Sequence, residues 1–234
     1  MKKEYRDIKL IKKSVENILK VIKPGDVVNT DGKGGGLFLR IGYWGIRAHQ
    51  KALFKNGNWR DTHTTLYFDE HDTFSVEPPR ATYLPLKSYC LDNISIYRYT
   101  KRNFNKKDIL IMEKACDELY GTFYDFGQLL DVAINQILGY DHAIKFNIFD
   151  FGKGQKICSV GIRNAYEKLR KTVEPEMERL FNKLNPEKWT VSQIEKFERT
   201  NVEATSPAHF ANSNYFNDEF KLIARFNMGK RIKL

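Results

Sequence analysis

One stretch, residues 63–79, constrains the fold more than any other part of the chain. Two runs rich in β-branched and aromatic residues, 63–68 and 73–77, flank a short polar segment. Runs of this kind around a polar turn predict a β-hairpin. Residues 94–99 alternate cleanly between apolar and polar and predict a further strand. The chain is therefore expected to contain an antiparallel sheet.

The register of this hairpin decides which side chains meet. If Tyr67 pairs with Thr73, His63 lies opposite Glu77, because strand side chains alternate between two faces. A histidine with a carboxylate across a hairpin is a general base with an orienting partner. The same pair is also an ordinary cross-strand contact. The apolar residues then share the other face, which supports this alignment: Leu66, Phe68, Phe74 and Val76.

A cysteine at the start of a helix is the second informative feature. Cys158 follows a loop, 151–155, whose two glycines disfavour helix, and Ile162, Ala165 and Tyr166 then recur at helical spacing. The first turn of a helix has unpaired N–H groups and the positive end of the dipole, which favours a thiolate and hence a nucleophile. The alternative is a buried structural cysteine.

The other elements follow from hydrophobic spacing and turn residues. The N-terminal stripe predicts an amphipathic helix ending near Lys23, packed on the domain rather than forming a coiled-coil arm. With no internal repeat and no linker, we expect an N-terminal helix over 1–23 and one domain over 24–234. The remaining predictions are a strand over 25–30, a helical turn at Ser206-Pro207, and a strand or a helix over 220–226. Helices are predicted over 37–54, over 106–119, from Asp125 onward, over 173–184 and over 191–199. In the first of these helices Trp44, Ala48 and Leu53 are expected to point inward, and in the second Cys116 is expected in the core.

Composition limits the class of protein. The 234 residues are 41% hydrophobic and 13% aromatic, enough for a sizeable core. The formal net charge of +10 points to an anionic partner such as nucleic acid, anionic lipid or an acidic cell-wall polymer, and no nucleic-acid motif is recognisable. Three widely spaced cysteines predict a reducing compartment rather than a disulfide framework. No signal peptide and no membrane span are recognisable, so a cytoplasmic or virion-associated location is expected.

Metal and cofactor sites are not expected. His49, His71, His142 and His209 show no ligand spacing for zinc.

The order histidine, acid, then cysteine at a helix start resembles the circularly permuted branch of the NlpC-type papain-like cysteine hydrolases. YiiX-like proteins are the most similar group, and lecithin:retinol-acyltransferase-like proteins are more distant. The resemblance rests on short pieces in a shared order: 24–28, 62–67, 76–78, 84–86, 121–125, 157–159 and 206–211. Two positions depart from the pattern. Val160 stands where relatives often have an acidic residue, and two prolines, Pro78 and Pro79, follow Glu77.

This resemblance implies an α+β, papain-like, circularly permuted fold, in which an antiparallel sheet packs against a cysteine-bearing helix and extra helices lie at both ends. Cys158 is then the nucleophile, His63 the base and Glu77 its orienter, with an acyl-enzyme intermediate. The backbone N–H of Cys158 is one oxyanion donor, and sequence identifies no second donor.

The substrate stays open at this level. The first hypothesis is an amidase or peptidase acting on cell-wall peptides or a related amide. The second is a lipid acyl thioesterase or acyltransferase. The third is a non-catalytic binding or structural module, for example in a phage particle.

Overall fold

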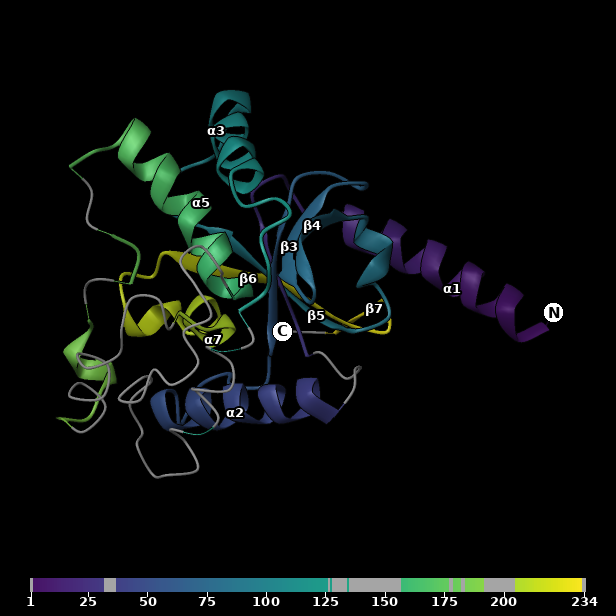
Figure 1. Cartoon of the computed structure of the whole chain (residues 1–234), viewed down its shortest axis with the longest axis horizontal. Helices are drawn as coiled ribbons and strands as arrows, with labels where there is room; N and C mark the ends of the chain where they lie inside the picture. Colours follow the sequence, from purple (N-terminus) through teal and green to yellow (C-terminus); the bar gives the residue numbers. More distant parts are fainter. Residues whose placement is uncertain are drawn as a thin grey trace.

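The protein is built on one antiparallel sheet with helices on both faces (Figure 1). The computed structural model describes residues 2–31, 37–125, 127, 134, 157–176, 179–181, 184–191 and 205–232. Within them the sheet has seven strands in the order β4-β3-β2-β1-β5-β6-β7. The strands are β1 (Val27–Thr30), β2 (His63–Tyr67), β3 (Thr73–Glu77), β4 (Arg80–Leu84), β5 (Asn93–Tyr99), β6 (Phe220–Asn227) and β7 (Lys230–Ile232). The α+β class with an antiparallel sheet is confirmed.

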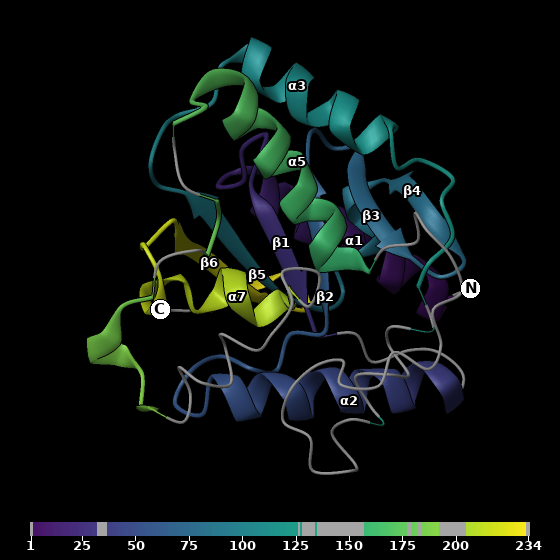
Figure 2. The same ribbon diagram turned by 60° about the vertical axis from the view of Figure 1, so that its left-hand side comes forward.

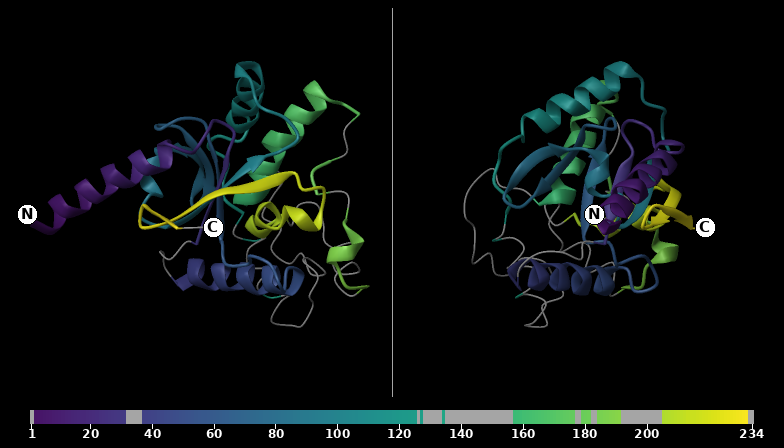
Figure 3. Two further views of the ribbon diagram at one scale, coloured as in Figure 1. Left: turned by 180° about the vertical axis from the view of Figure 1, so that it is seen from behind. Right: turned by 90° about the vertical axis from the view of Figure 1, so that its right-hand side faces the viewer.

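The helices form separate layers. Helices α3 and α5 lie side by side in front of the sheet (Figure 2), and α1 lies behind it and extends outward (Figure 3). Helix α2 crosses below one end of the sheet (Figure 1). The helices are α1 (Lys2–Leu19), α2 (Leu37–Leu53), α3 (Lys106–Asp117), α5 (Cys158–Val173) and α7 (Pro207–Ala211), with 3-10 turns η1 (Leu86–Ser88), η2 (Pro186–Lys188) and η4 (Ser213–Tyr215).

Each face of the sheet has its own core. Leu66, Phe74 and Val76 pack with α3 and α5 in the larger apolar cluster. The smaller cluster lies on the other face, where α1 and η1 cover residues such as Val28 and Tyr67. Strand alternation produces this division, because neighbouring residues of β1 and of β2 enter different clusters.

Helix α5 approaches β3 closely because of a glycine. A Cβ atom added at Gly161 would lie 2.6 Å from the Cγ2 atom of Val76. A helix carrying any larger side chain here would have to stand further from the sheet. Further along α5, the Tyr166 hydroxyl donates a hydrogen bond to the backbone carbonyl of Gly25, which fixes the helix against the turn before β1.

The hairpin register is as expected. Strands β2 and β3 pair Tyr67 with Thr73 and Thr65 with Ser75. Residues 220–226, left undecided between strand and helix, lie in strand β6. Ser206 begins α7 as its N-cap, with Pro207 at the first helical position, and Cys116 is fully buried, both as expected.

Four expectations were wrong or incomplete. Helix α1 ends at Leu19 rather than near Lys23. Trp44 is 51% exposed instead of inward, because the buried stripe of α2 runs through Ile46, Gln50 and Leu53. Strand β4 was not predicted. It directly follows two prolines, and only one of its five residues, Ala81, is buried.

The predicted helix over 173–184 is also wrong. Helix α5 ends at Val173, and Glu174 has φ −141° and ψ 71°. The cause is Pro175, which forces the preceding residue out of the helical region. The predicted loop 151–155 and the predicted helices from Asp125 and over 191–199 lie almost wholly outside the described residues.

The glycine contact generates a stability prediction. Gly161→Ala should destabilise the fold by about 1–2 kcal/mol, because overlap with Val76 outweighs the roughly 1 kcal/mol that alanine gains over glycine in a helix. Urea denaturation measures this change. In a Val76→Ala background, which removes the obstructing methyl, the same substitution should become neutral or stabilising. Equal costs in both backgrounds would show that the contact does not limit the packing of α5.

Candidate active site

His63 and Glu77 meet at one end of the sheet. His63 is the first residue of β2 and Glu77 the last of β3. The imidazole Nε2 lies 3.5 Å from Glu77 Oε2 and 2.8 Å from the Ser75 hydroxyl oxygen. The ring also stacks on Tyr89, with centroids 6.0 Å apart. The cross-strand pair expected from the hairpin therefore exists, and a serine hydroxyl joins it.

Both polar contacts of the imidazole use the same nitrogen. A carboxylate facing Nε2 favours the tautomer that carries hydrogen there, which leaves the lone pair on Nδ1. Within the described part of the chain, no hydrogen bond to Nδ1 is recorded. Burial lowers the pKa of His63 to about 4, so the ring is neutral at pH 7. Burial also raises the pKa of Glu77, while the Ser75 hydroxyl opposes this change.

Cys158 occupies the first position of α5 and is 1% exposed. Burial raises the pKa of its thiol to about 11. The backbone N–H groups of Thr64, Ser159 and Cys158 act in the opposite direction and lower it. The Ser159 hydroxyl donates to the Thr205 carbonyl. The helix start thus supplies donors, as its sequence suggested, but burial outweighs them in this conformation.

The thiol and the imidazole belong to the same end of the sheet. Thr64, whose N–H approaches the sulfur, directly follows His63. The ladder between β2 and β3 ends at the pair Thr65–Ser75, so it is already open at Thr64. The sulfur lies at this opening, beside the strand that carries the histidine.

The side chain of His63 and the helix that carries Cys158 lie on different faces of β2. Helix α5 packs on the face that carries Leu66 and Val76, whereas His63 alternates onto the opposite face with Ser75. No hydrogen bond between Cys158 and His63 is recorded among the residues that the structure describes. The structure therefore brings His63 and Glu77 together, and the complete triad with Cys158 stays a prediction.

A small cavity adjoins the thiol. Its volume is about 20 Å³, room for about one water molecule. Its walls come from α2, from Tyr124 after α3, and from the starts of α5 and α7: Ile46, His49, Tyr124, Ile157, Ser159, Ser206 and Pro207. Sequence reasoning gave His49 no place here, because on an amphipathic helix it resembles any other inward residue. A substrate carbonyl can reach the sulfur only if one of these walls moves.

Buried polar groups hold these walls in place. Gln50 of α2 donates from Nε2 to the Asp61 carbonyl at 2.8 Å, and its Oε1 accepts from the Ala208 N–H at 2.9 Å. Asn29 of β1 donates to the Pro207 carbonyl at 2.9 Å. Burial raises the pKa of the Asp61 carboxyl to about 6, against hydrogen bonds from Asn29 and Asn58. Helix α2, the sheet and α7 are thus tied together next to the thiol.

Comparison with known proteins gives similarity at the level of structure. No protein-family model matches the chain, and no curated protein matches it. The crystal structure of metalloprotein YiiX from Escherichia coli O157:H7 is similar, with a TM-score of 0.47 and 14% sequence identity. The alignment covers 88% of this chain and 98% of that chain.

The described residues also limit metal binding and membrane insertion. They contain no group of three or more histidine, cysteine, aspartate or glutamate side chains arranged to hold a metal ion. None of their helices combines the length and the apolar character needed to cross a bilayer.

The low pKa of His63 generates a pH prediction. The folded pKa of about 4 lies below the usual 6.5, so the unfolded chain binds the extra proton first as pH falls. Stability from this group is present above pH 6.5 and is lost toward pH 4. Between pH 7 and pH 5 the loss should be about 2 kcal/mol. Urea denaturation at both pH values should show a smaller loss for His63→Gln, and identical losses for both proteins would contradict the burial of a neutral ring.

Proposed function

We propose that the chain is a cysteine hydrolase with a papain-like, circularly permuted arrangement of Cys158, His63 and Glu77. The observation that supports this proposal is which nitrogen of the imidazole is already engaged. Glu77 engages Nε2, and Nδ1 is left to accept a proton, at the end of the sheet where the Thr64 N–H meets the thiol. Cys158 attacks a carbonyl carbon and the thiol proton passes to His63. The bond from that carbon to the leaving amine or thiol breaks, His63 returns the proton to the leaving group, and the resulting acyl-enzyme is resolved by water or another acceptor.

The described conformation is the closed, resting form in this proposal. With pKa values of about 11 for Cys158 and about 4 for His63, proton transfer between them is uphill by on the order of 10 kcal/mol. Burial is the main cause of both shifts. Movement of α2 away from the thiol admits water or substrate, which lowers the pKa of the thiol and raises that of the imidazole. Because His63 alternates onto the face opposite to α5, forming the triad also requires its ring to turn toward the sulfur at the open end of the ladder.

Two backbone groups suit the oxyanion. The N–H of Cys158 lies at the helix start, and the N–H of Thr64 approaches the same sulfur from β2. Donors fixed by a helix and by a strand need no reorganisation when negative charge develops on the carbonyl oxygen. Thr64 thereby supplies the second donor that sequence alone did not identify.

The substrate class follows the sequence hypotheses. We favour an amide or peptide of the cell wall, and a long-chain acyl thioester is the enzymatic alternative. The net charge of +10 suits attachment of either substrate to an anionic polymer or lipid surface.

A second candidate is a non-catalytic binding module. The specific observation in its favour is the burial of the thiol: Cys158 is 1% exposed and its pKa is raised rather than lowered. Structural cysteines are buried and inert in this way.

Turnover distinguishes the two candidates. Cys158→Ala should abolish release of peptides from purified cell wall, or of fatty acid from an acyl thioester, whichever the wild type performs. His63→Ala should lower kcat about 100-fold or more, because a general base is lost. Glu77→Gln should have a smaller effect of about tenfold, since the ring keeps its contact with Ser75.

Cys90→Ala is the matched control. Cys90 is a buried thiol in the smaller apolar cluster, and its sulfur donates to the Lys87 carbonyl at 3.1 Å. Its variant should keep wild-type turnover, and a thiol-reactive probe should label Cys158 faster than Cys90. Absence of turnover on both substrates, with equally slow labelling of all cysteines, would favour the binding module.

A further inference from the structure

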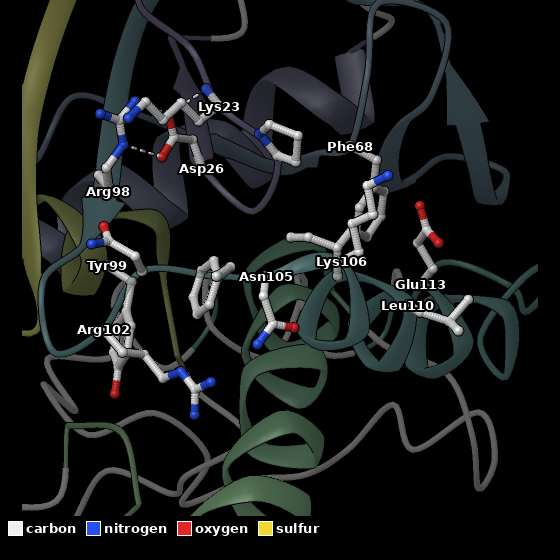
Figure 4. Close-up of a pocket in the computed structure, with 14 residues that line it drawn as sticks. Lys23, Asp26, Phe68, Arg98, Tyr99, Arg102, Asn105, Lys106, Leu110 and Glu113 are labelled. Carbon is white, nitrogen blue, oxygen red and sulfur yellow. Dashed lines mark hydrogen bonds and ion pairs between the residues drawn. The ribbon is translucent and has the colours of Figure 1, made fainter.

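A second cavity lies at the other end of the sheet. Its volume is about 650 Å³, within the range of small-molecule sites. It lies beyond Val27, whereas His63 pairs with Thr30 at the opposite end of β1. Residues from the turn before β1, the end of β5 and the first half of α3 line it (Figure 4). It shares no residue with the cavity beside Cys158, and the proposed hydrolase uses none of it.

A buried ion pair makes one wall rigid. Asp26, 2% exposed, accepts from Arg98 Nε at 2.8 Å and from Nη2 at 2.7 Å. Nη2 also donates to the Val21 carbonyl at 2.7 Å. The Arg98 guanidinium is therefore held along the edge formed by Nε and Nη2, and no partner of Nη1 is recorded among the described residues. An arginine fixed from behind in this way is a pre-organised donor for an anion.

Two lysines add positive charge to the lining, although Asp26 lies close enough to Lys23 for the two charges to attract each other. The ammonium groups of Lys23 and Lys106 have no recorded partner among the described residues, and both lysines line the cavity. Arg102 also lines it and is fixed by Asp108 at 2.8 Å. Arg102 also pairs with Glu174 at 3.1 Å, so its charge is already neutralised. The lining thus holds three other cationic side chains, Lys23, Arg98 and Lys106, against the carboxylates of Asp26 and Glu113. Of these carboxylates, Asp26 is already engaged by Arg98 and lies beside it in Figure 4.

The floor of the cavity is aromatic. Phe68 and Tyr99 are each 4% exposed, and the rings of Tyr99 and Phe104 stack with centroids 5.7 Å apart and an interplanar angle of 9°. The Tyr99 hydroxyl is buried and has no hydrogen-bond partner in the described structure. An apolar body resting on these rings would remove further surface from water.

We propose that this cavity binds a small organic anion, in which a carboxylate, sulfonate or phosphate group is attached to an aromatic or aliphatic body. The acidic group lies beside Arg98 and Lys23, and Lys106, drawn nearer to Glu113 in Figure 4, adds its charge from the other side of the cavity. The apolar body covers Phe68, Tyr99 and Phe104. Glu113, at the far side of the opening in Figure 4, repels a second acidic group and so selects ligands that are charged at one end.

The test uses 8-anilinonaphthalene-1-sulfonate, an aromatic monoanion whose fluorescence rises in apolar surroundings. The wild type should show saturable binding. Lys23→Gln and Lys106→Gln should each raise the Kd about threefold to tenfold, as expected for loss of one partly exposed charge contact. Glu113→Gln should lower the Kd, because it removes a repulsive charge. The full-length protein is used throughout, and circular dichroism confirms that each variant is folded.

Lys107→Gln is the matched control. Lys107 is the neighbour of Lys106 on α3, is exposed and does not line the cavity, so its variant should change the Kd less than twofold. Displacement of the dye by dodecanoate assigns a lipid-derived carboxylate, and displacement by phenyl phosphate assigns a phosphate ester. Equal Kd values for the Lys106 and Lys107 variants, or no displacement by either compound, would overturn the proposal.

Discussion

The candidate active site depends on the antiparallel pairing of β2 with β3 and on the point where it stops. The pairing aligns His63 with the strand end that carries Glu77, and it ends at Thr65–Ser75. One residue beyond the last pair, the N–H of Thr64 meets the sulfur of Cys158 rather than continuing the ladder. A ladder one pair longer would engage that donor within the sheet. The position of the thiol is thus set by where the sheet opens.

Burial opposes the chemistry proposed for these groups. Three backbone donors around a thiol at a helix start favour the thiolate, yet the raised pKa of Cys158 shows that exclusion of water has the larger effect. The neutral form of His63 is favoured for the same reason. A site of this kind protects its sulfur from oxidation and from unwanted reactions until a wall moves. The hydrogen bonds of Gln50 to the Asp61 carbonyl and to the Ala208 N–H fix the wall whose movement would control it.

Alternation and spacing predicted the local features well. The hairpin register followed from the parity of Leu66 and Val76, and Cys116 was placed in the core by the apolar stripe of its helix. The relation between Cys158 and His63 was not predictable, because it depends on the crossing of α5 over β3 at Gly161 and on the end of the ladder. The cavity near Arg98 was not predictable either, since Asp26 and Arg98 are 72 positions apart.

The donor that Thr64 offers has an evolutionary consequence. It belongs to the main chain, so every amino acid except proline supplies it. The side chain of Thr64 is engaged elsewhere, donating to Asn29 Oδ1 at 2.9 Å. The donor itself therefore places no demand on the side chain at position 64, and only the buried hydrogen bond to Asn29 restricts it. A backbone donor requires no particular residue type, so it produces no sequence motif. Relatives with the same environment around the sulfur will be found by structural superposition of their strands rather than by sequence comparison.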